Sequence, residues 1–386
     1  MNKKLMAVAV AGALAAPAVA FAQASNVQIY GRANVGLDNV SATGATAANS
    51  DFKGRNRVWD QGSRLGFRGT EDLGGGLKAV FDIQTGINMD NGTTTGANGS
   101  VNASTGTLAS RDSYGGIEGG FGSVRFGRQS VWWTNLNDQT QSDYINVGLQ
   151  FETGGFGRLG SPSARTSNVM KYTSPVWSGF QATISYSPQS ENAVANADPN
   201  GKLWGATFTY QGPVMLQWDW AKKNVETPAA AGSLQNVITG NKLGIGWNYR
   251  PNAIISLSWI QLKNENNTAV AGFSATGDSL KQTAWQANWY HYFGNLQAIA
   301  QLGKLGDVKG CNVIDGCKNT SANSYMLAAK YHFSKRTGAY VSYTKISNSS
   351  NQTADYSGGN MGVAPTGALP AGADPKIFAV GVLHNF

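Results

Sequence analysis

The residues of this 386-residue chain that could perform chemistry are few and widely spaced. Its histidines are His291, His332 and His384, and none has a serine, a cysteine or a pair of acids at a spacing typical of a nucleophile and its base. The sequence also contains no phosphate-binding glycine loop, no zinc-ligand spacing and no calcium-binding loop. It therefore predicts no catalytic residue, no metal site and no cofactor, and an enzyme is the least favoured functional class.

Cys311 and Cys317 are the two cysteines of the chain. Two are too few for a disulfide scaffold or for a cysteine-rich metal site. Their separation of six residues permits a small disulfide-closed ring. Because so short a loop closes easily, the bond would contribute about 2 kcal/mol in the chain-entropy model. We expect a disulfide that stiffens one long polar connection without changing the stability of the whole fold.

The N-terminus has the pattern of a cleaved export signal. Lys3 and Lys4 precede an apolar run over residues 5–19, and Ala20-Phe21-Ala22 supplies small residues at the cleavage site. The run is too short for a membrane-spanning helix, which needs about 20 residues. We expect residues 1–22 to be removed and residues 23–386 to form one exported domain.

Composition and charge exclude other classes of protein. Charged residues make up 13% of the chain, which also contains 49 glycines, whereas about 25% is usual for soluble domains. After residue 22 there are 28 cations against 22 acids, but no run of cations exceeds two. A nucleic-acid-binding protein would group its cations in contiguous patches. We therefore expect no nucleic-acid partner.

Alternation with a period of two residues runs through most of the chain after residue 22. In residues 27–37 and 77–87, apolar side chains occupy one face and polar or charged side chains the other. In residues 214–221 the apolar residues alternate with Met215, Gln217, Asp219 and Ala221, and in residues 243–249 they alternate with Gly244, Gly246 and Asn248. Half-buried β-strands produce this signal. The mature chain is therefore expected to be all-β.

The connections between the predicted strands alternate regularly in length. Seven are tight, at residues 72–76, 119–122, 174–179, 211–213, 250–252, 293–295 and 334–338. Eight are long and polar, near residues 39–63, 89–110, 130–166, 188–202, 222–240, 263–280, 304–323 and 347–375. This order predicts eight hairpins, and hence a sixteen-stranded antiparallel transmembrane β-barrel with short periplasmic turns and long extracellular loops. A soluble sandwich or propeller is the less favoured alternative.

The chain resembles the general porins of β-proteobacteria, the neisserial and Burkholderia–Comamonas type, along essentially its whole mature length. Six segments carry the resemblance in the family's order, namely NVQIYGRANVGLD, GSRLGFRGTEDLGGGLKAVFDIQTGI, GGFGSVRFGRQ, NVMKYTSPVWSGF, YHFSKRTGAYVSY and FAVGVLHNF. The resemblance implies a homotrimer in the cell outer membrane, in contact with lipid and lipopolysaccharide. It also implies a water-filled channel for small hydrophilic solutes and ions, narrowed by an inward-folded third loop. That loop, residues 130–166, is the least family-like part of the chain.

Strand alternation places a set of cations on the inner face of the first five strands. These are Arg32, Arg64, Arg68, Lys78 and Arg125. A charge at mid-depth on the lipid face would cost about 2–4 kcal/mol, although the cost is small near an interface. The third loop carries the acids Asp138, Asp143 and Glu152. We expect these acids to face the basic wall across the constriction, and a moderate preference for anions; ordinary solvated loop acids are the alternative.

Two apolar features remain. Val131, Trp132 and Trp133 give the third loop a foothold, either inside the barrel or at the centre of a trimer. The terminal Phe386 follows an alternating strand, as in barrels that the outer-membrane assembly machinery inserts, and we interpret it as an assembly signal. A barrel specific for phosphate or organic acids, and an adhesin with a plugged lumen, are the competing functional classes.

Overall fold

The computed structural model describes residues 26–90, 108–132, 158–159, 162, 164–188, 202–224, 236–265, 273–356 and 369–386. The expected export signal, residues 1–22, lies outside these ranges. Every regular element within them is a β-strand. A search of the same ranges finds no helix that has the length and apolar character needed to cross a membrane.

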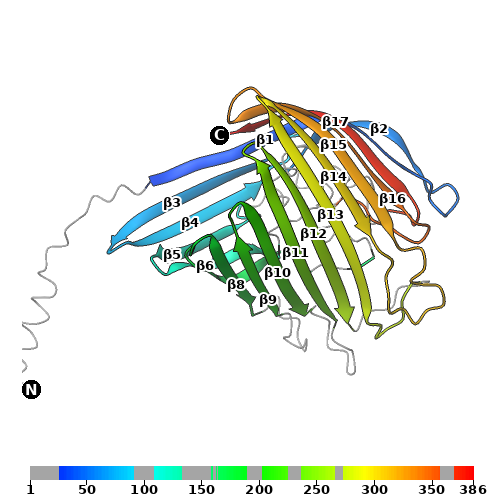
Figure 1. Cartoon of the computed structure of the whole chain (residues 1–386), viewed down its shortest axis with the longest axis horizontal. Helices are drawn as coiled ribbons and strands as arrows, with labels where there is room; N and C mark the ends of the chain where they lie inside the picture. The colour runs from blue at the N-terminus through cyan, green and yellow to red at the C-terminus, as the bar shows by residue number, and fades with distance from the viewer. Residues whose placement is uncertain are drawn as a thin grey trace, which may run out of the picture.

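Seventeen strands form one sheet. They are β1 (Asn26–Thr43), β2 (Phe52–Asp60), β3 (Arg64–Gly74), β4 (Leu77–Gly86), β5 (Ser113–Gly119), β6 (Gly122–Val131), β7 (Ala164–Thr173), β8 (Phe180–Ser187), β9 (Leu203–Tyr210), β10 (Val214–Asn224), β11 (Val237–Arg250), β12 (Ala253–Glu265), β13 (Leu280–Phe293), β14 (Leu296–Leu305), β15 (Ala322–His332), β16 (Thr337–Asn348) and β17 (Asp374–Asn385). From β3 onward each strand pairs antiparallel with the next, and β1 pairs with β17. The sheet therefore closes into a barrel (Figure 1).

β2 and β3 together occupy one position in the barrel wall. Residues 35–42 of β1 pair with β2, and residues 26–32 of the same strand pair with β3. Residues 61–63 separate β2 from β3, and the Ser63 N–H donates to Asp60 Oδ1 across this break at 3.0 Å. The barrel is therefore sixteen-stranded, which confirms the predicted fold class.

Side chains alternate between an apolar outer face and a lumen face. On β10, Leu216 is 46% exposed, whereas the neighbouring Gln217 and Asp219 are 5% and 1% exposed. On β11, Leu243 and Ile245 are likewise exposed, while Lys242 is buried. Since the closed sheet has only two faces, the exposed apolar positions form the outer surface. That surface suits the hydrocarbon of a membrane.

The first long connection is shorter than the sequence indicated. It covers residues 44–51, not 39–63, because β1 continues to Thr43 and β2 begins at Phe52. An ion pair of 2.7 Å joins Arg57 of β2 to Asp38 of β1. Charged residues interrupt the apolar alternation of residues 52–60, so a search for alternation misses this strand. The seven tight turns and the other long connections occur in the predicted order, and the tight turns lie at one end of the barrel.

Strand tilt carries each row of hydrogen-bonded neighbours obliquely across the wall. Arg32 of β1 lies opposite Asn385 of β17 on one side and opposite Arg64 of β3 on the other. Arg64 in turn lies opposite Gly86 of β4. Asn385 ends β17 at the turn end of the barrel, whereas Gly86 ends β4 at the long-loop end. This stagger is what lets a sheet close.

Aromatic side chains gather on the outer surface near the tight turns. The Trp289 indole N–H donates to the Tyr249 hydroxyl at 2.8 Å, and that hydroxyl lies 3.0 Å from Nδ1 of His291. His291 also stacks on Phe293, with ring centroids 4.2 Å apart. Rings with polar edges suit the interface between lipid and water. His291 therefore belongs to this aromatic girdle.

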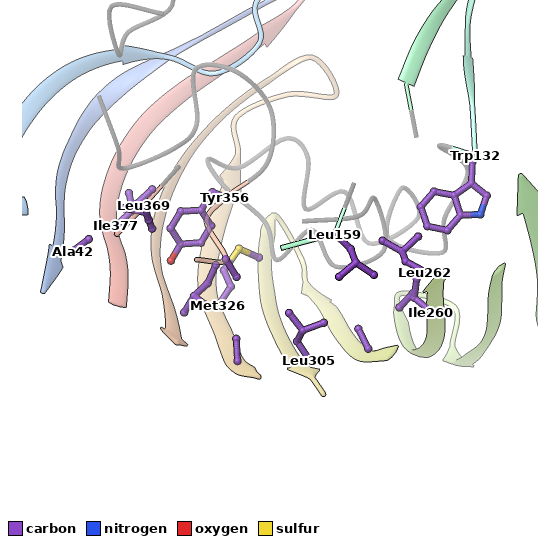
Figure 2. Packing of buried hydrophobic residues seen from close by; sticks show 14 of the residues in the cluster. Ala42, Trp132, Leu159, Ile260, Leu262, Leu305, Met326, Tyr356, Leu369 and Ile377 are labelled. Carbon is purple, nitrogen blue, oxygen red and sulfur yellow. The ribbon is translucent and has the colours of Figure 1, made fainter. Parts of the chain in front are cut away.

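Part of the lumen is filled by an apolar core. Its strand residues labelled in Figure 2 include Ile260, Leu262, Leu305, Met326 and Ile377, each no more than 2% exposed. Leu159 and Tyr356, from the third and eighth long connections, belong to the same cluster. Figure 2 shows them on the lumen side of these strands. Long connections therefore fold inward and cover one side of the inner wall.

The last residue completes the seam between the two ends of the chain. The Gly31 N–H donates to the Phe386 carbonyl at 3.0 Å, and the Phe386 N–H donates to the Gly31 carbonyl at 3.1 Å. The Phe386 ring lies directly over Gly31, in the space that a Cβ would need. Phe386 also stacks with His384 at 6.3 Å. Glycine at position 31 thus makes room for the terminal ring.

We predict that deleting Phe386 lowers the amount of folded protein in outer-membrane fractions and raises periplasmic aggregates, because the deletion removes both seam hydrogen bonds. Quantitative blotting of fractionated cells measures both pools. F386Y retains an aromatic terminus and should insert normally, as should F378L at an outward position of the same strand. Normal insertion of the truncated chain would show that Phe386 is an ordinary girdle residue.

Cys311 and Cys317 have sulfur atoms 1.95 Å apart and Cα atoms 5.7 Å apart, in the seventh long connection. We predict that peptides prepared without reduction contain this bond, and that a C311S/C317S variant unfolds within about 2 kcal/mol of the wild type. Mass spectrometry of the peptides and chemical unfolding measure the two quantities. Two free thiols in freshly prepared protein would contradict the prediction.

Candidate functional site

The third long connection enters the lumen directly after β6. Val131 and Trp132 are 4% and 2% exposed, and the Trp132 indole N–H donates to the Asp219 carbonyl of β10 at 3.3 Å. A Cβ at Gly205 would overlap Val131, and one at Gly240 would overlap the Trp132 ring. Glycines on the inner faces of β9 and β11 therefore admit the start of this loop. The apolar foothold predicted from residues 131–133 lies inside the barrel, while Trp133 is outside the described residues.

The far end of the same connection also contacts the inner wall. Leu159 is 4% exposed within the lumen core. Arg158 donates from Nε to the Asn351 carbonyl at 2.6 Å and lies over the Phe273 ring, 5.3 Å from its centroid. The loop is thus held inside at both ends. The predicted acids Asp138, Asp143 and Glu152 lie outside the described residues.

A buried ion pair supports the entry of the loop. Lys242 of β11 and Asp219 of β10 are each 1% exposed at the side chain, with Nζ and Oδ2 3.5 Å apart. The Thr207 hydroxyl donates to Asp219 Oδ1 at 2.7 Å. The Lys242 ammonium also lies over the Trp132 ring, 4.5 Å from its centroid. This cation–π contact ties the loop to the charged pair.

Arg32 and Arg64 face one another across the β1–β3 pair. Arg32 is 5% exposed, and its Nη2 lies 3.5 Å from the carbonyl oxygens of Gln61 and Gly62. Backbone carbonyl groups in the break between β2 and β3 therefore face the Arg32 guanidinium. Arg64 is half-buried and occupies the directly opposite register position. These two predicted residues of the basic wall are brought together.

A hydrogen-bond network continues this wall across β1 and β4. The Tyr30 hydroxyl donates to Asp82 Oδ1 at 2.6 Å and accepts from Gln84 Nε2 at 3.1 Å. Arg111, which lies just before β5, donates from Nε to Gln84 Oε1 at 2.7 Å. Arg68 lies over the Tyr30 ring, 4.9 Å from its centroid. Two guanidinium groups are therefore attached to one network of neutral groups and a single acid.

The other two predicted cations lie closer to the tight turns. Lys78 is the second residue of β4, is exposed, and pairs in register with Asp72 and Glu118. Arg125 is the fourth residue of β6, forms an ion pair with Glu118, and lies over the Tyr114 ring at 4.6 Å. Both therefore face acids near the periplasmic end. The structure does not bring Lys78 to the level where the third loop enters.

Arg111 and Arg165 join the basic wall although alternation did not select them. Burial, together with the positive charges of Arg165, Arg64 and Arg32, lowers the pKa of Arg111 to about 9, so it stays charged at neutral pH. Arg165 Nε lies 3.2 Å from Asp112 Oδ1. Arg111 falls in a long connection and Arg165 at the very start of β7. The sequence feature that could have identified Arg111 and Arg165 as wall residues was their position beside the ends of two predicted strands.

The arrangement suits ion passage better than catalysis. Basic and neutral polar side chains line one wall, and the described residues contain no group of three or more His, Cys, Asp or Glu side chains that could hold a metal ion. His332 Nε2 lies 3.2 Å from Gln297 Oε1, and His384 Nδ1 lies 2.9 Å from the Thr337 hydroxyl. These histidines thus have structural partners on neighbouring strands. Charge along a lumen controls which ions cross it.

Comparison with known proteins gives the relationships of the chain. Outer membrane porin protein 32 of Delftia acidovorans is 27% identical over 393 residues, covering 100% of both chains. Major outer membrane protein P.IB of Neisseria lactamica is 26% identical over 360 residues, covering 89% of this chain and 92% of its own. The solved anion-selective porin from Comamonas acidovorans aligns with a TM-score of 0.71 and 25% identity, over 94% of this chain and 100% of its own. The sequence model of the Gram-negative porin family matches residues 7–351, and this chain therefore belongs to the Gram-negative porins of the outer membrane.

Proposed function

We propose that this porin, a general diffusion channel for small hydrophilic solutes and ions, has a moderate preference for anions. The observation that carries this proposal is the gathering of Arg32, Arg64, Arg111 and Arg165 on one inner wall, close enough for their charges to interact. In a confined passage, charges are less screened than at an open surface. An anion near this wall is therefore stabilised relative to a cation.

Acids on the same wall keep the preference moderate. Asp82 lies within the Tyr30 network, and Asp112 pairs with Arg165. We propose that Asp138, Asp143 and Glu152 of the third loop face the arginines across the constriction, since both ends of that loop are held inside. The solved relative from Comamonas is described as anion-selective. Its overall similarity supports the same sign of preference here.

We propose that the working unit is a homotrimer, as the family resemblance implies. The strand lengths support an assembly. β5 has 7 residues and β13 has 14. At about 3.3 Å per residue and a tilt of about 40°, β5 rises only about 18 Å, less than the apolar band of about 25 Å. The wall at β5 is thus too low to face lipid alone, and a second copy would cover it.

The remaining parts of the proposal concern export and insertion. We propose that residues 1–22 are a cleaved signal and that residues 23–386 form the barrel domain. The apolar outer face would contact lipid and lipopolysaccharide. The barrel assembly machinery would read the terminal strand through Phe386. N-terminal sequencing of the purified porin tests the first point, and a start near Gln23 is expected.

We predict that an R64Q/R68Q/R111Q variant loses its anion preference. The change removes three positive charges from the lumen wall while leaving Asp82 and Asp112 in place. A change of about 0.5 kcal/mol in the energy of an ion at the constriction alters a permeability ratio roughly twofold. The zero-current potential in a KCl gradient across a planar bilayer should therefore shift toward cations, most strongly at low salt.

The matched control removes the same charge outside the lumen. K281Q/K309Q/K318Q neutralises three exposed lysines of β13 and the seventh long connection. This control should keep the wild-type zero-current potential. The arginine proposal is wrong if the two triple variants behave alike, or if the wild-type channel is clearly cation-selective.

We also predict that the buried pair holds the third loop in place. K242M leaves the buried Asp219 without its ammonium partner, at a cost of about 3–5 kcal/mol. The variant should unfold at lower denaturant concentration and show a noisier single-channel current, because Trp132 loses its cation. K242M/D219N should regain much of the stability, whereas K263M in the exposed Lys263–Glu265 pair should change it by less than about 1 kcal/mol. Equal effects of K242M and K263M would refute the assignment.

A further inference from the structure

A further basic feature lies at the turn end of the barrel, beside the tight turn between β15 and β16, and shares Arg64 with the basic wall. It is a cavity of about 290 Å³. Its walls come from β3, β15, β16, β17 and the tight turn between β15 and β16. The lining residues are Arg64, Lys330, His332, Lys335, Arg336, Thr337, Gly338, Leu383 and Asn385. The lining therefore contains four cations and no aspartate or glutamate.

Lys330 forms the buried side of this cavity. It is 4% exposed, at an inward position of β15 directly before the outward Tyr331. Its aliphatic stem crosses Gly338, where a Cβ would come within 3.2 Å of Lys330 Cε. The small residue thus lets a long cation lie flat against the wall. Lys330 is also close enough to Arg32 for their charges to interact.

The rim of the cavity is held in a fixed shape by its turn. The Ser334 hydroxyl oxygen accepts the N–H groups of Arg336 and Thr337, each at 3.1 Å. This is the local pattern by which a hydroxyl stabilises a turn. Lys335 and Arg336 at the tip are exposed. Two exposed cationic side chains therefore extend from a hydrogen-bonded turn beside a buried cation.

The neutral groups around the cavity add donors without adding negative charge. His332 is positioned by Gln297, whose amide oxygen lies 3.2 Å from its Nε2. Thr337 and Asn385 supply a hydroxyl and an amide. No aspartate or glutamate accompanies these groups among the lining residues.

We propose that this cavity is a binding site for a phosphate group. Two arginines can each present a pair of N–H donors to the oxygens of such an anion, and lysines add point charges. The volume exceeds that of a bare phosphate ion, so a small phosphorylated solute also fits. The same chemistry is offered by a phospholipid headgroup at the membrane edge. This goes beyond a diffuse anion preference, because a built cavity predicts saturable binding.

Isothermal titration calorimetry of the full-length porin in detergent tests the proposal, with sodium phosphate as the probe and sodium chloride at equal ionic strength as the reference. Wild-type protein should bind phosphate saturably, and chloride should not reproduce the signal. R336Q should weaken phosphate binding about tenfold or more, since one charge-assisted hydrogen bond is lost. R250Q removes an exposed arginine from the β11–β12 turn, outside the cavity, and should bind as the wild type does.

A second arm distinguishes the source of the phosphate group. In nanodiscs containing phosphatidylglycerol, a headgroup in the cavity should compete with added phosphate and weaken its apparent affinity, compared with nanodiscs of phosphatidylcholine. Competition in wild type but not in R336Q assigns the cavity to lipid, and its absence assigns it to a free solute. The proposal is overturned if phosphate binding is unsaturable in both settings, or unchanged in K335Q/R336Q. Zero-current potentials report the anion preference separately, so either proposal can fail alone.

Discussion

The need to satisfy every backbone N–H and C=O group within a membrane governs this structure. Lipid offers these groups no hydrogen-bond partner, so a sheet that crosses it must have no free edge. The closure of β1 on β17, continued by the reciprocal bonds between Gly31 and Phe386, meets that requirement. Strand tilt, the two-faced alternation and the short turns then follow from closing sixteen strands around a lumen.

Most of the architecture was predictable because it depends on local patterns. Strand number followed from the alternation of tight turns and long connections, and the inward direction of Arg32, Arg64 and Arg68 followed from the period of two. β2 was missed because Lys53, Arg55 and Arg57 interrupt its apolar alternation. Its pairing depends on contacts with β1, such as Asp38, that become adjacent only in the fold.

The basic wall was only partly predictable, since residues outside the regular strands contribute to it. Arg111 reaches the wall from a long connection and bonds to Gln84 of β4. The lumen core was also missed, because inward apolar residues such as Ile260 and Leu262 contradict a simple polar interior. In the sequence, such residues appear as a strand that is apolar on both faces, and this pattern indicates where a loop covers the inner wall. Gly240, which pairs in register with Leu262, and Gly205 lie on the same wall, where Trp132 and Val131 pack against them.

The oblique row from Asn385 through Arg32 and Arg64 to Gly86 affects how an ion would travel. Neighbours in this row stand at different heights, so its two cations, Arg32 and Arg64, do not lie at one depth. A ring would create a single deep well, and an ion held there would leave slowly. Cations placed at different depths spread their attraction along the passage, which favours conduction over capture. The geometric stagger that closes the sheet thereby also smooths the energy profile of the permeating ion.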